Sequence, residues 1–211
     1  MIATRTHSFC TVSGDPFQVM EHTLHNGLRL YLSVNPFEPR IFTNIAVRAG
    51  SKQDPADTTG LAHYMEHMLF KGTSRIGALD WARESALLER ISDLYEQHRH
   101  AETEEERHAL YAEIDRVSNE AAPLAAANEY DKLSGAIGAN HTVYVNEIPR
   151  NELERWMRLE SERFRMMALR LFHTELETVY EEFNISQDRD FRKVGNALRA
   201  MLYPAHPYGT Q

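Results

Sequence analysis

The fold of this sequence is decided by residues 60–73, GLAHYMEHMLFKGT. The apolar run over residues 61–70 predicts a helix, and Gly72 stands where the end of a helix often has glycine. His63 and His67 are four residues apart, so their imidazoles lie on one face of that helix and can bind one Zn²⁺. We therefore predict a metal centre on this helix.

Glu66 lies beside the two histidines and is free to act as a general base. A bound zinc ion lowers the pKa of a water from about 15.7 to near 7, and a neighbouring carboxylate can take the proton. The alternative is a pair of surface or capped core histidines, because five residues in this order also arise by chance.

A catalytic zinc site usually has three protein ligands and one open position. Glu175 and Glu182 are two helical turns apart and border an apolar stripe, where an unpaired carboxylate is costly. Glu182 can reach the zinc, and Glu175 can orient a ligand from behind. On helix position alone, two solvated surface glutamates are the more common arrangement.

Strands and helices alternate irregularly along the chain. Asn26-Gly27 predicts a hairpin between strands at 17–24 and 28–34. Further strands are expected at 40–49 and 141–148. Asn151 is the expected N-cap of a helix that turns its apolar residues inward, namely Leu153, Trp156, Met157, Phe164 and Met167. Two more helices are expected at 172–187 and 192–202, the first with an inward stripe of Phe172, Leu176, Val179 and Phe183.

Residues 79–121 differ from the rest because two narrow apolar stripes flank a very polar stretch at 97–107. This pattern predicts an inserted helical hairpin with charged outer faces. Long surface insertions cost little loop entropy, so we expect the hairpin to leave the metal site undisturbed.

Composition narrows the function further. The net charge of −8 argues against nucleic acid as a partner, and Cys10, the single cysteine, permits no internal disulfide. No stretch reaches the roughly 20 apolar residues of a membrane span, and no signal peptide is visible. A soluble protein is expected, and the sequence leaves cytoplasmic and periplasmic locations open.

Several spaced motifs resemble the pitrilysin and insulin-degrading-enzyme family of zinc metallopeptidases, whose HxxEH order marks the inverzincins. They are Arg48-Ala-Gly-Ser51, the stretch at 60–73, Glu175-Leu-Glu-Thr-Val-Tyr-Glu-Glu182 and His206-Pro-Tyr-Gly209. The resemblance implies that His63, His67 and Glu182 bind one Zn²⁺ per chain, with Glu66 as the base and Glu175 behind the ligands.

The resemblance also implies an architecture and a partner. We expect residues 1–211 to form an α+β, two-layer N-terminal domain, incomplete at its C-terminus, with a mainly antiparallel sheet and helices on one face. The implied activity is hydrolysis of peptide bonds in extended peptides, assisted by a second pitrilysin-like domain or subunit that contributes oxyanion donors.

The sequence departs from the family pattern near residues 138–143, which is short by around ten residues where family members form the strand that pairs with substrate. A non-catalytic subunit or scaffold that binds peptides is therefore the rival interpretation. The four motif residues are intact, which favours the enzyme.

Overall fold

The computed structural model describes residues 10–11, 13–126 and 134–210. These residues form two compact units, Met1–Ile41 and Phe42–Gln211, and each unit is described by itself. Among the described residues, no helix is both long enough and apolar enough to cross a membrane.

The first unit is a small antiparallel sheet. Its strands are β1 (Cys10–Thr11), β2 (Met20–Thr23) and β3 (Arg29–Leu32), in the order β1-β2-β3. The predicted hairpin is confirmed, although its strands are shorter than expected. Gly27 has φ +89° in the turn, a value that favours glycine, and the Asn26 side chain accepts a hydrogen bond from the Leu28 N–H.

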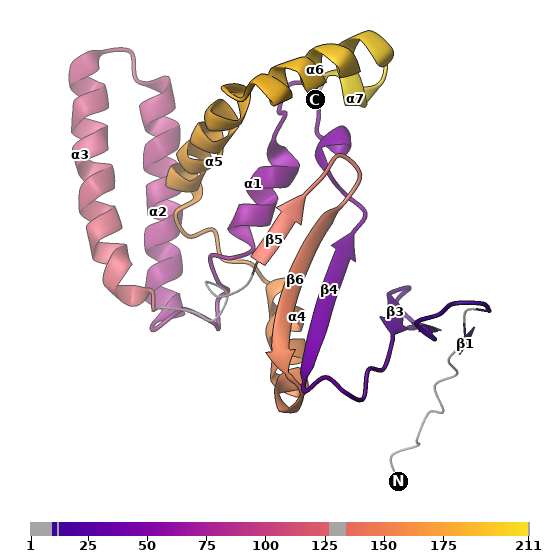
Figure 1. Ribbon diagram of the computed structural model, residues 1–211. Helices are drawn as coiled ribbons and strands as arrows, with labels where there is room; N and C mark the ends of the chain where they lie inside the picture. The colour runs from indigo at the N-terminus through magenta and orange to yellow at the C-terminus, as the bar shows by residue number, and fades with distance from the viewer. Residues whose placement is uncertain (1–9, 12, 127–133, 211) are drawn as a thin grey trace. The chain divides into compact units, whose positions relative to one another are not determined.

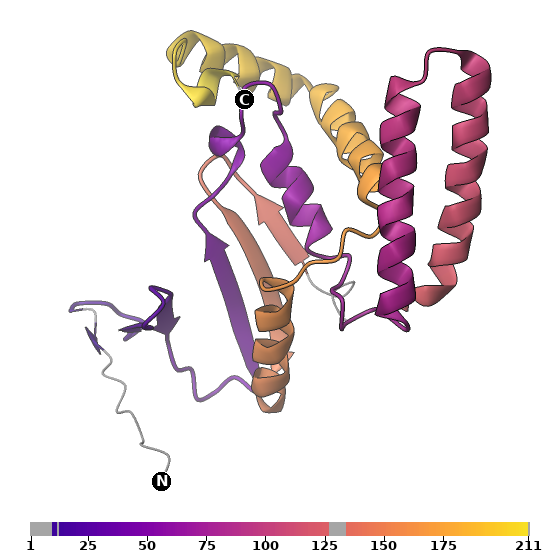
Figure 2. The ribbon, with the colours of Figure 1, turned by 180° about the vertical axis from the view of Figure 1, so that it is seen from behind.

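The second unit contains the sheet that lies beside the predicted site. Its strands are β4 (Arg40–Val47), β5 (Ser134–Ile137) and β6 (Thr142–Pro149), in the order β4-β6-β5, with neighbours antiparallel (Figure 1). Helices α1 (Leu61–Met68) and α4 (Leu153–Arg163) cover the same face, which is turned toward the viewer in Figure 2. The predicted α+β class is confirmed.

Helix α5 (Phe172–Gln187) packs against α1 and completes the core of this unit. Tyr64 and Met68 from α1 meet Val179 from α5, and Met167 and Phe172 pack around them. This core fixes the two helices that carry all the predicted ligands. Other helices and 3-10 turns among the described residues are α6 (Asp190–Leu202), α7 (Pro207–Thr210), η1 (Ser51–Gln53), η2 (Ala122–Leu124) and η4 (Arg150–Glu152).

The predicted helical hairpin is present as α2 (Trp81–His100) and α3 (Glu104–Ala121). Leu94, Ile114 and Val117 form its own buried cluster, and Thr103 caps α3 in a capping box with Glu106. The hairpin also contacts the rest of this unit. Glu84 on α2 forms a buried ion pair with Arg170, which precedes α5.

Two local predictions are wrong. Asn151 is not an N-cap, because the 3-10 turn at 150–152 comes first and α4 begins without a side-chain cap. The inward faces of two helices also differ from expectation. The side chains that are exposed instead are Leu153, Met157, Phe164, Leu176 and Phe183.

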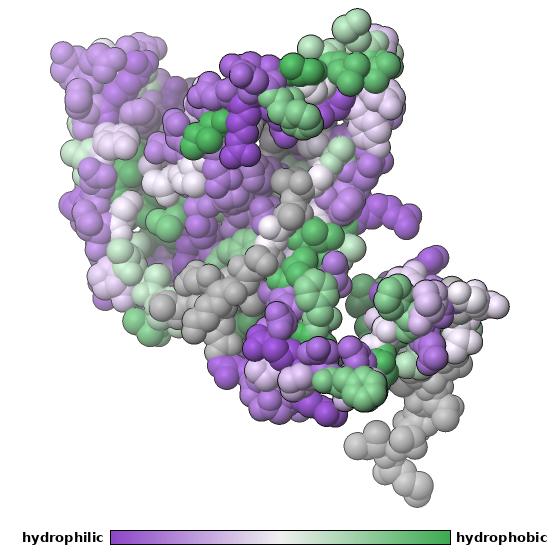
Figure 3. Space-filling model, in the orientation of Figure 1, coloured by the Kyte–Doolittle hydropathy of each residue, from purple (hydrophilic) through white to green (hydrophobic). Residues whose placement is uncertain are grey.

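In α5 the inward positions belong to Glu175 and Val179, while Leu176 and Phe183 are each 52% exposed. The helix is therefore rotated relative to its apolar stripe. In Figure 3, hydrophilic residues cover the helical hairpin, and apolar ones gather over α6 and α7. The exposed apolar residues of α6 include Phe191, Val194, Leu198 and Met201.

Candidate metal centre

The start of α1 places the two histidines. Gly60 precedes the helix with φ +93°, a conformation that favours glycine. The Asp54 carboxylate accepts hydrogen bonds from the N–H groups of Gly60 (2.8 Å) and Ala62 (2.8 Å), which would otherwise lack helical partners. This cap fixes the direction of α1, and so of His63 one turn further on.

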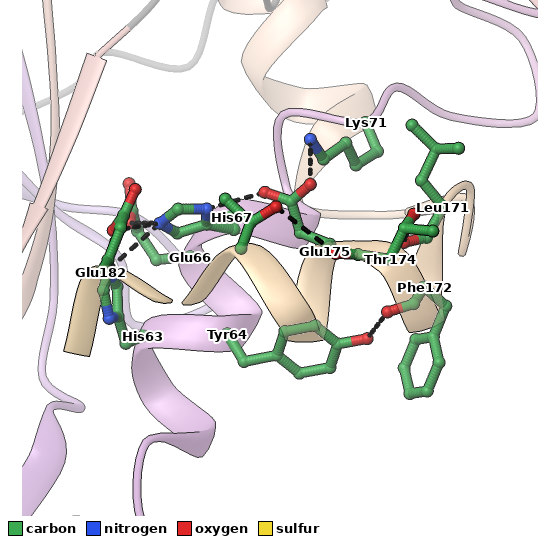
Figure 4. Close-up of polar contacts among 11 residues, drawn as sticks. His63, Tyr64, Glu66, His67, Lys71, Leu171, Phe172, Thr174, Glu175 and Glu182 are labelled. Atoms are coloured by element: carbon green, nitrogen blue, oxygen red, sulfur yellow. Dashed lines mark hydrogen bonds and ion pairs between the residues drawn. The ribbon is translucent and has the colours of Figure 1, made fainter. Parts of the chain in front are cut away.

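His63, His67 and Glu182 converge at one point between α1 and α5 (Figure 4). The two Nε2 atoms are 3.1 Å apart, and each lies 3.4 Å from Oε2 of Glu182. Three donors about 2.0 to 2.1 Å from a tetrahedral zinc ion would be about 3.3 Å apart. The spacing of the three atoms therefore fits a zinc ion.

The chemistry of the donors fits as well. Nδ1 of His67 lies 2.8 Å from Oε1 of Glu175, so this nitrogen carries the ring hydrogen and Nε2 presents a lone pair. Burial and the neighbouring His67 lower the pKa of His63, which favours its neutral imidazole. Two imidazole nitrogens and a carboxylate oxygen form a donor set that suits a divalent cation. Glu182 is half exposed, which leaves the site open on one side.

Glu175 lies behind His67, on the side of the ring away from the converging donor atoms. Its Oε1 accepts from His67, and its Oε2 forms an ion pair of 2.5 Å with Nζ of Lys71. Burial raises the pKa of Glu175, but the hydrogen bonds from Lys71 and His67 outweigh burial and lower it overall. The carboxylate is therefore held ionised, in the form that orients a histidine ligand.

Glu66 is buried next to the three converging groups. Its Oε2 lies 3.8 Å from Nε2 of His67, too far for a hydrogen bond but close enough for one intervening water. Burial is the largest influence on the pKa of Glu66 and raises it above the ordinary value for a glutamate. A carboxylate with a raised pKa is a stronger proton acceptor, which suits a general base.

Strand β5 lies against this carboxylate. A Cβ atom added at Gly135 would overlap Oε1 of Glu66, so the absence of a side chain there makes room for the base. The segment that looked short in sequence forms a tight turn in which the N–H of Gly138 donates to the carbonyl of His141 (2.9 Å). Asn140 accepts a hydrogen bond from the hydroxyl of Tyr208 (2.7 Å). Strand β5 is therefore the edge of the sheet nearest Glu66.

All five predicted residues thus lie together, and the contacts add others that sequence reasoning missed. The hydroxyl of Tyr64 donates to the carbonyl of Phe172 and joins α1 to the start of α5. Asp54, Lys71 and Gly135 also surround the site. Asp54 carried no signal in the sequence, because Gly60 and not Asp54 occupies the N-cap position of α1.

The chain is similar in sequence to several known proteins. Residues 30–122 match the family described as Insulinase (Peptidase family M16). An uncharacterized zinc protease of Bacillus subtilis is 33% identical over 64 residues, which are 30% of this chain and 16% of that protein. The probable mitochondrial-processing peptidase subunit beta of Arabidopsis thaliana is 36% identical over 92 residues, which are 44% of this chain and 16% of that protein.

Two solved structures share the fold. The crystal structure of pitrilysin is similar to this chain, with a TM-score of 0.59 and 17% sequence identity. The alignment covers 97% of this chain and 18% of the pitrilysin chain. The first half of the periplasmic protease PqqL from Escherichia coli aligns with 94% of this chain and 37% of its own, at a TM-score of 0.59 and 18% identity. The chain therefore spans a small part of its relatives' length. The match of residues 30–122 to this family and the shared fold together support a pitrilysin-like N-terminal domain.

Proposed function

We propose that the chain is the zinc-binding part of an endopeptidase that hydrolyses peptide bonds in extended peptides. The observation that carries this proposal is the convergence of His63, His67 and Glu182 at distances that suit one Zn²⁺. A bound zinc ion would supply Lewis acidity, which polarises a carbonyl and makes a water acidic near neutral pH.

The remaining steps belong to side chains of this chain. Glu66 accepts a proton from the attacking water and passes it to the leaving amine, and its buried carboxylate suits that exchange. Glu175 keeps the imidazole of His67 in one tautomer and one orientation. The edge of β5, next to Glu66, offers backbone groups for an extended peptide to pair with.

The proposal includes a second half. We treat residues 1–211 as one zinc-binding domain with the hairpin at 79–121 as an insertion, and we assign the missing oxyanion donors to a second pitrilysin-like domain or subunit. The likeness to the first half of a longer protease supports this division. Removing an oxyanion donor costs about 10² to 10³ in rate, so the chain alone would turn over slowly.

The test is the zinc content of the purified chain, measured beside Glu182→Gln and a matched control, Glu181→Gln. Glu181 is an exposed neighbour on the same helix, so its substitution changes charge but no ligand. We expect one zinc per chain in the parent and in the control. In Glu182→Gln we expect the affinity to fall more than about hundredfold, because losing even an outer partner of a ligand costs up to that much.

Cleavage of a quenched peptide in the same samples separates the two functions. Cleavage that needs zinc and disappears in Glu66→Gln would establish the enzyme. Zinc binding without cleavage, even after a second half is added, would favour the rival, a non-catalytic peptide-binding subunit. A parent chain that binds no zinc would refute the metallopeptidase proposal.

A further inference from the structure

Lys71 occupies the side of the Glu175 carboxylate that faces away from the metal site (Figure 4). A glutamate carboxylate that is held through only one oxygen can still rotate about its Cγ–Cδ bond. Here Oε1 accepts from His67 and Oε2 pairs with Lys71, so both oxygens are fixed. Glu175 is buried and Lys71 is only a quarter exposed, so solvent weakens this ion pair less than it would a surface pair.

The backbone of Lys71 is held in turn by Arg170. This buried guanidinium donates to the carbonyl of Lys71 (2.9 Å) and to the carbonyl of Thr73 (3.0 Å). It also forms two hydrogen bonds to Glu84 on α2, of 2.5 Å and 3.0 Å. Arg170 therefore joins three segments that are distant in sequence, namely the loop after α1, the residues before α5, and the helical hairpin.

We propose that Lys71 and Arg170 are positioning residues for the metal ligand His67, with Lys71 acting through Glu175 and Arg170 acting through the loop that carries Lys71. This inference rests on the proposed zinc site. Neither residue reaches the converging donors, and neither takes part in proton transfer. Their effect is to hold the acceptor behind His67 at one place, which keeps Nε2 directed at the metal.

A purely structural role makes a different prediction from a positioning role. An ion pair that only stabilises the fold changes the melting temperature of the metal-free protein and leaves the zinc affinity of the folded protein unchanged. A positioning residue changes the zinc affinity of a protein that is still folded. The two quantities are therefore measured on the same variants.

The decisive variant is Lys71→Met, which keeps most of the side-chain volume and removes the charge. Its matched control is Arg75→Met, which removes a cation four residues further on that pairs with Glu162 at 3.6 Å, away from Glu175. Zinc affinity is measured by competition with a chelator. We expect Lys71→Met to bind zinc about 10- to 100-fold more weakly than the parent, and Arg75→Met to match the parent.

The visible spectrum of the Co²⁺-loaded protein reports the ligand geometry directly. We expect the bands to change in Lys71→Met and to stay the same in Arg75→Met. Equal affinities and spectra for Lys71→Met and the parent would overturn the proposal, as would equal losses in the two variants. Absence of zinc from the parent would instead refute the proposed function on which the inference rests.

Arg170→Met alone would leave Glu84 buried without its partner and can unfold the chain, so both charges are removed together in Glu84→Leu/Arg170→Met. Replacing both members of a buried pair with apolar residues often preserves stability. We expect this double variant to remain folded, with some loss of stability from the unpaired carbonyls of Lys71 and Thr73, and to bind zinc several-fold more weakly. Adding Lys71→Met to this double variant should then lower the zinc affinity less than Lys71→Met does in the parent, because Arg170 acts through Lys71. Losses of zinc affinity that add fully would show that the two residues act independently, which would contradict the proposal.

Discussion

At the scale of single residues, Arg163 shows how this fold accommodates a charge in its core. The side chain is 1% exposed and pairs with Glu160 one turn earlier on α4. Its guanidinium lies 4.6 Å from the ring centre of Tyr144 and 5.2 Å from that of Phe70, so aromatic faces supply part of the attraction that water would give.

We predict that Arg163→Met destabilises the chain by about 3 to 5 kcal/mol, because it leaves Glu160 buried without its counter-charge. Glu160→Leu/Arg163→Met should recover most of that loss, since it removes both charges. Urea unfolding followed by circular dichroism measures both variants. Equal losses in the single and double variants would show that packing against the rings, and not the ion pair, is what matters.

His173 gives the fold a dependence on pH. Its ring stacks on Tyr95 of the helical hairpin, with centroids 3.8 Å apart, and burial lowers its pKa below the ordinary value. Nε2 of His173 is buried and has no hydrogen-bond partner. In the unfolded chain the imidazole takes up a proton near pH 6.5, whereas the folded chain resists it. The unfolded state therefore binds more protons below that pH.

We therefore predict that the free energy of unfolding falls as the pH drops from about 7.5 to about 5.5, an interval that contains the pKa of histidine in the unfolded chain. His173→Phe keeps an aromatic ring for stacking and cannot be protonated. Its urea midpoint should fall less over the same interval than that of the parent. A parallel fall in the two proteins would assign the pH dependence to other groups.

At the scale of elements, the sequence predicted what depends on spacing within one helix. His63 and His67 share a face because they are four residues apart, and Glu175 and Glu182 share one because they are seven apart. The hairpin of α2 and α3 followed from two periodic stripes. These features need no knowledge of what lies opposite.

Features that depend on a distant partner were not predictable. The inward face of α5 carries Glu175, not Leu176, because His67 and Lys71 lie across from it, more than 100 residues earlier. A pattern of apolar residues alone cannot predict that a glutamate faces inward, because a cation and an imidazole from elsewhere in the chain stabilise it. The partnership of Arg170 with Glu84 was missed for the same reason, since neither residue stands out within its own segment.

At the scale of the whole molecule, we propose that the inserted helical hairpin braces the candidate site. Its base closes on itself, because Ala78 and Ala125 form an antiparallel bridge and the N–H of Leu79 donates to the carbonyl of Leu124 (2.8 Å). Its first helix holds Arg170, and through it the loop behind His67. An insertion that merely bulged would have no buried ion pair with the site's neighbour.

This geometry predicts the result of excising the hairpin. Residues 80–123 can be replaced by Asn-Gly, because the chain ends at Leu79 and Leu124 are already paired as in a tight hairpin. We expect the excised chain to be less stable than the parent, since Arg170 would lose its hydrogen bonds to Glu84. Adding Arg170→Met should restore folding but not the parent's zinc affinity, because nothing would then hold the carbonyl of Lys71. Urea unfolding and chelator competition measure the two effects. If the excised chain with Arg170→Met bound zinc as tightly as the parent, the loop that carries Lys71 would need no brace. Excision of a surface segment otherwise costs little loop entropy.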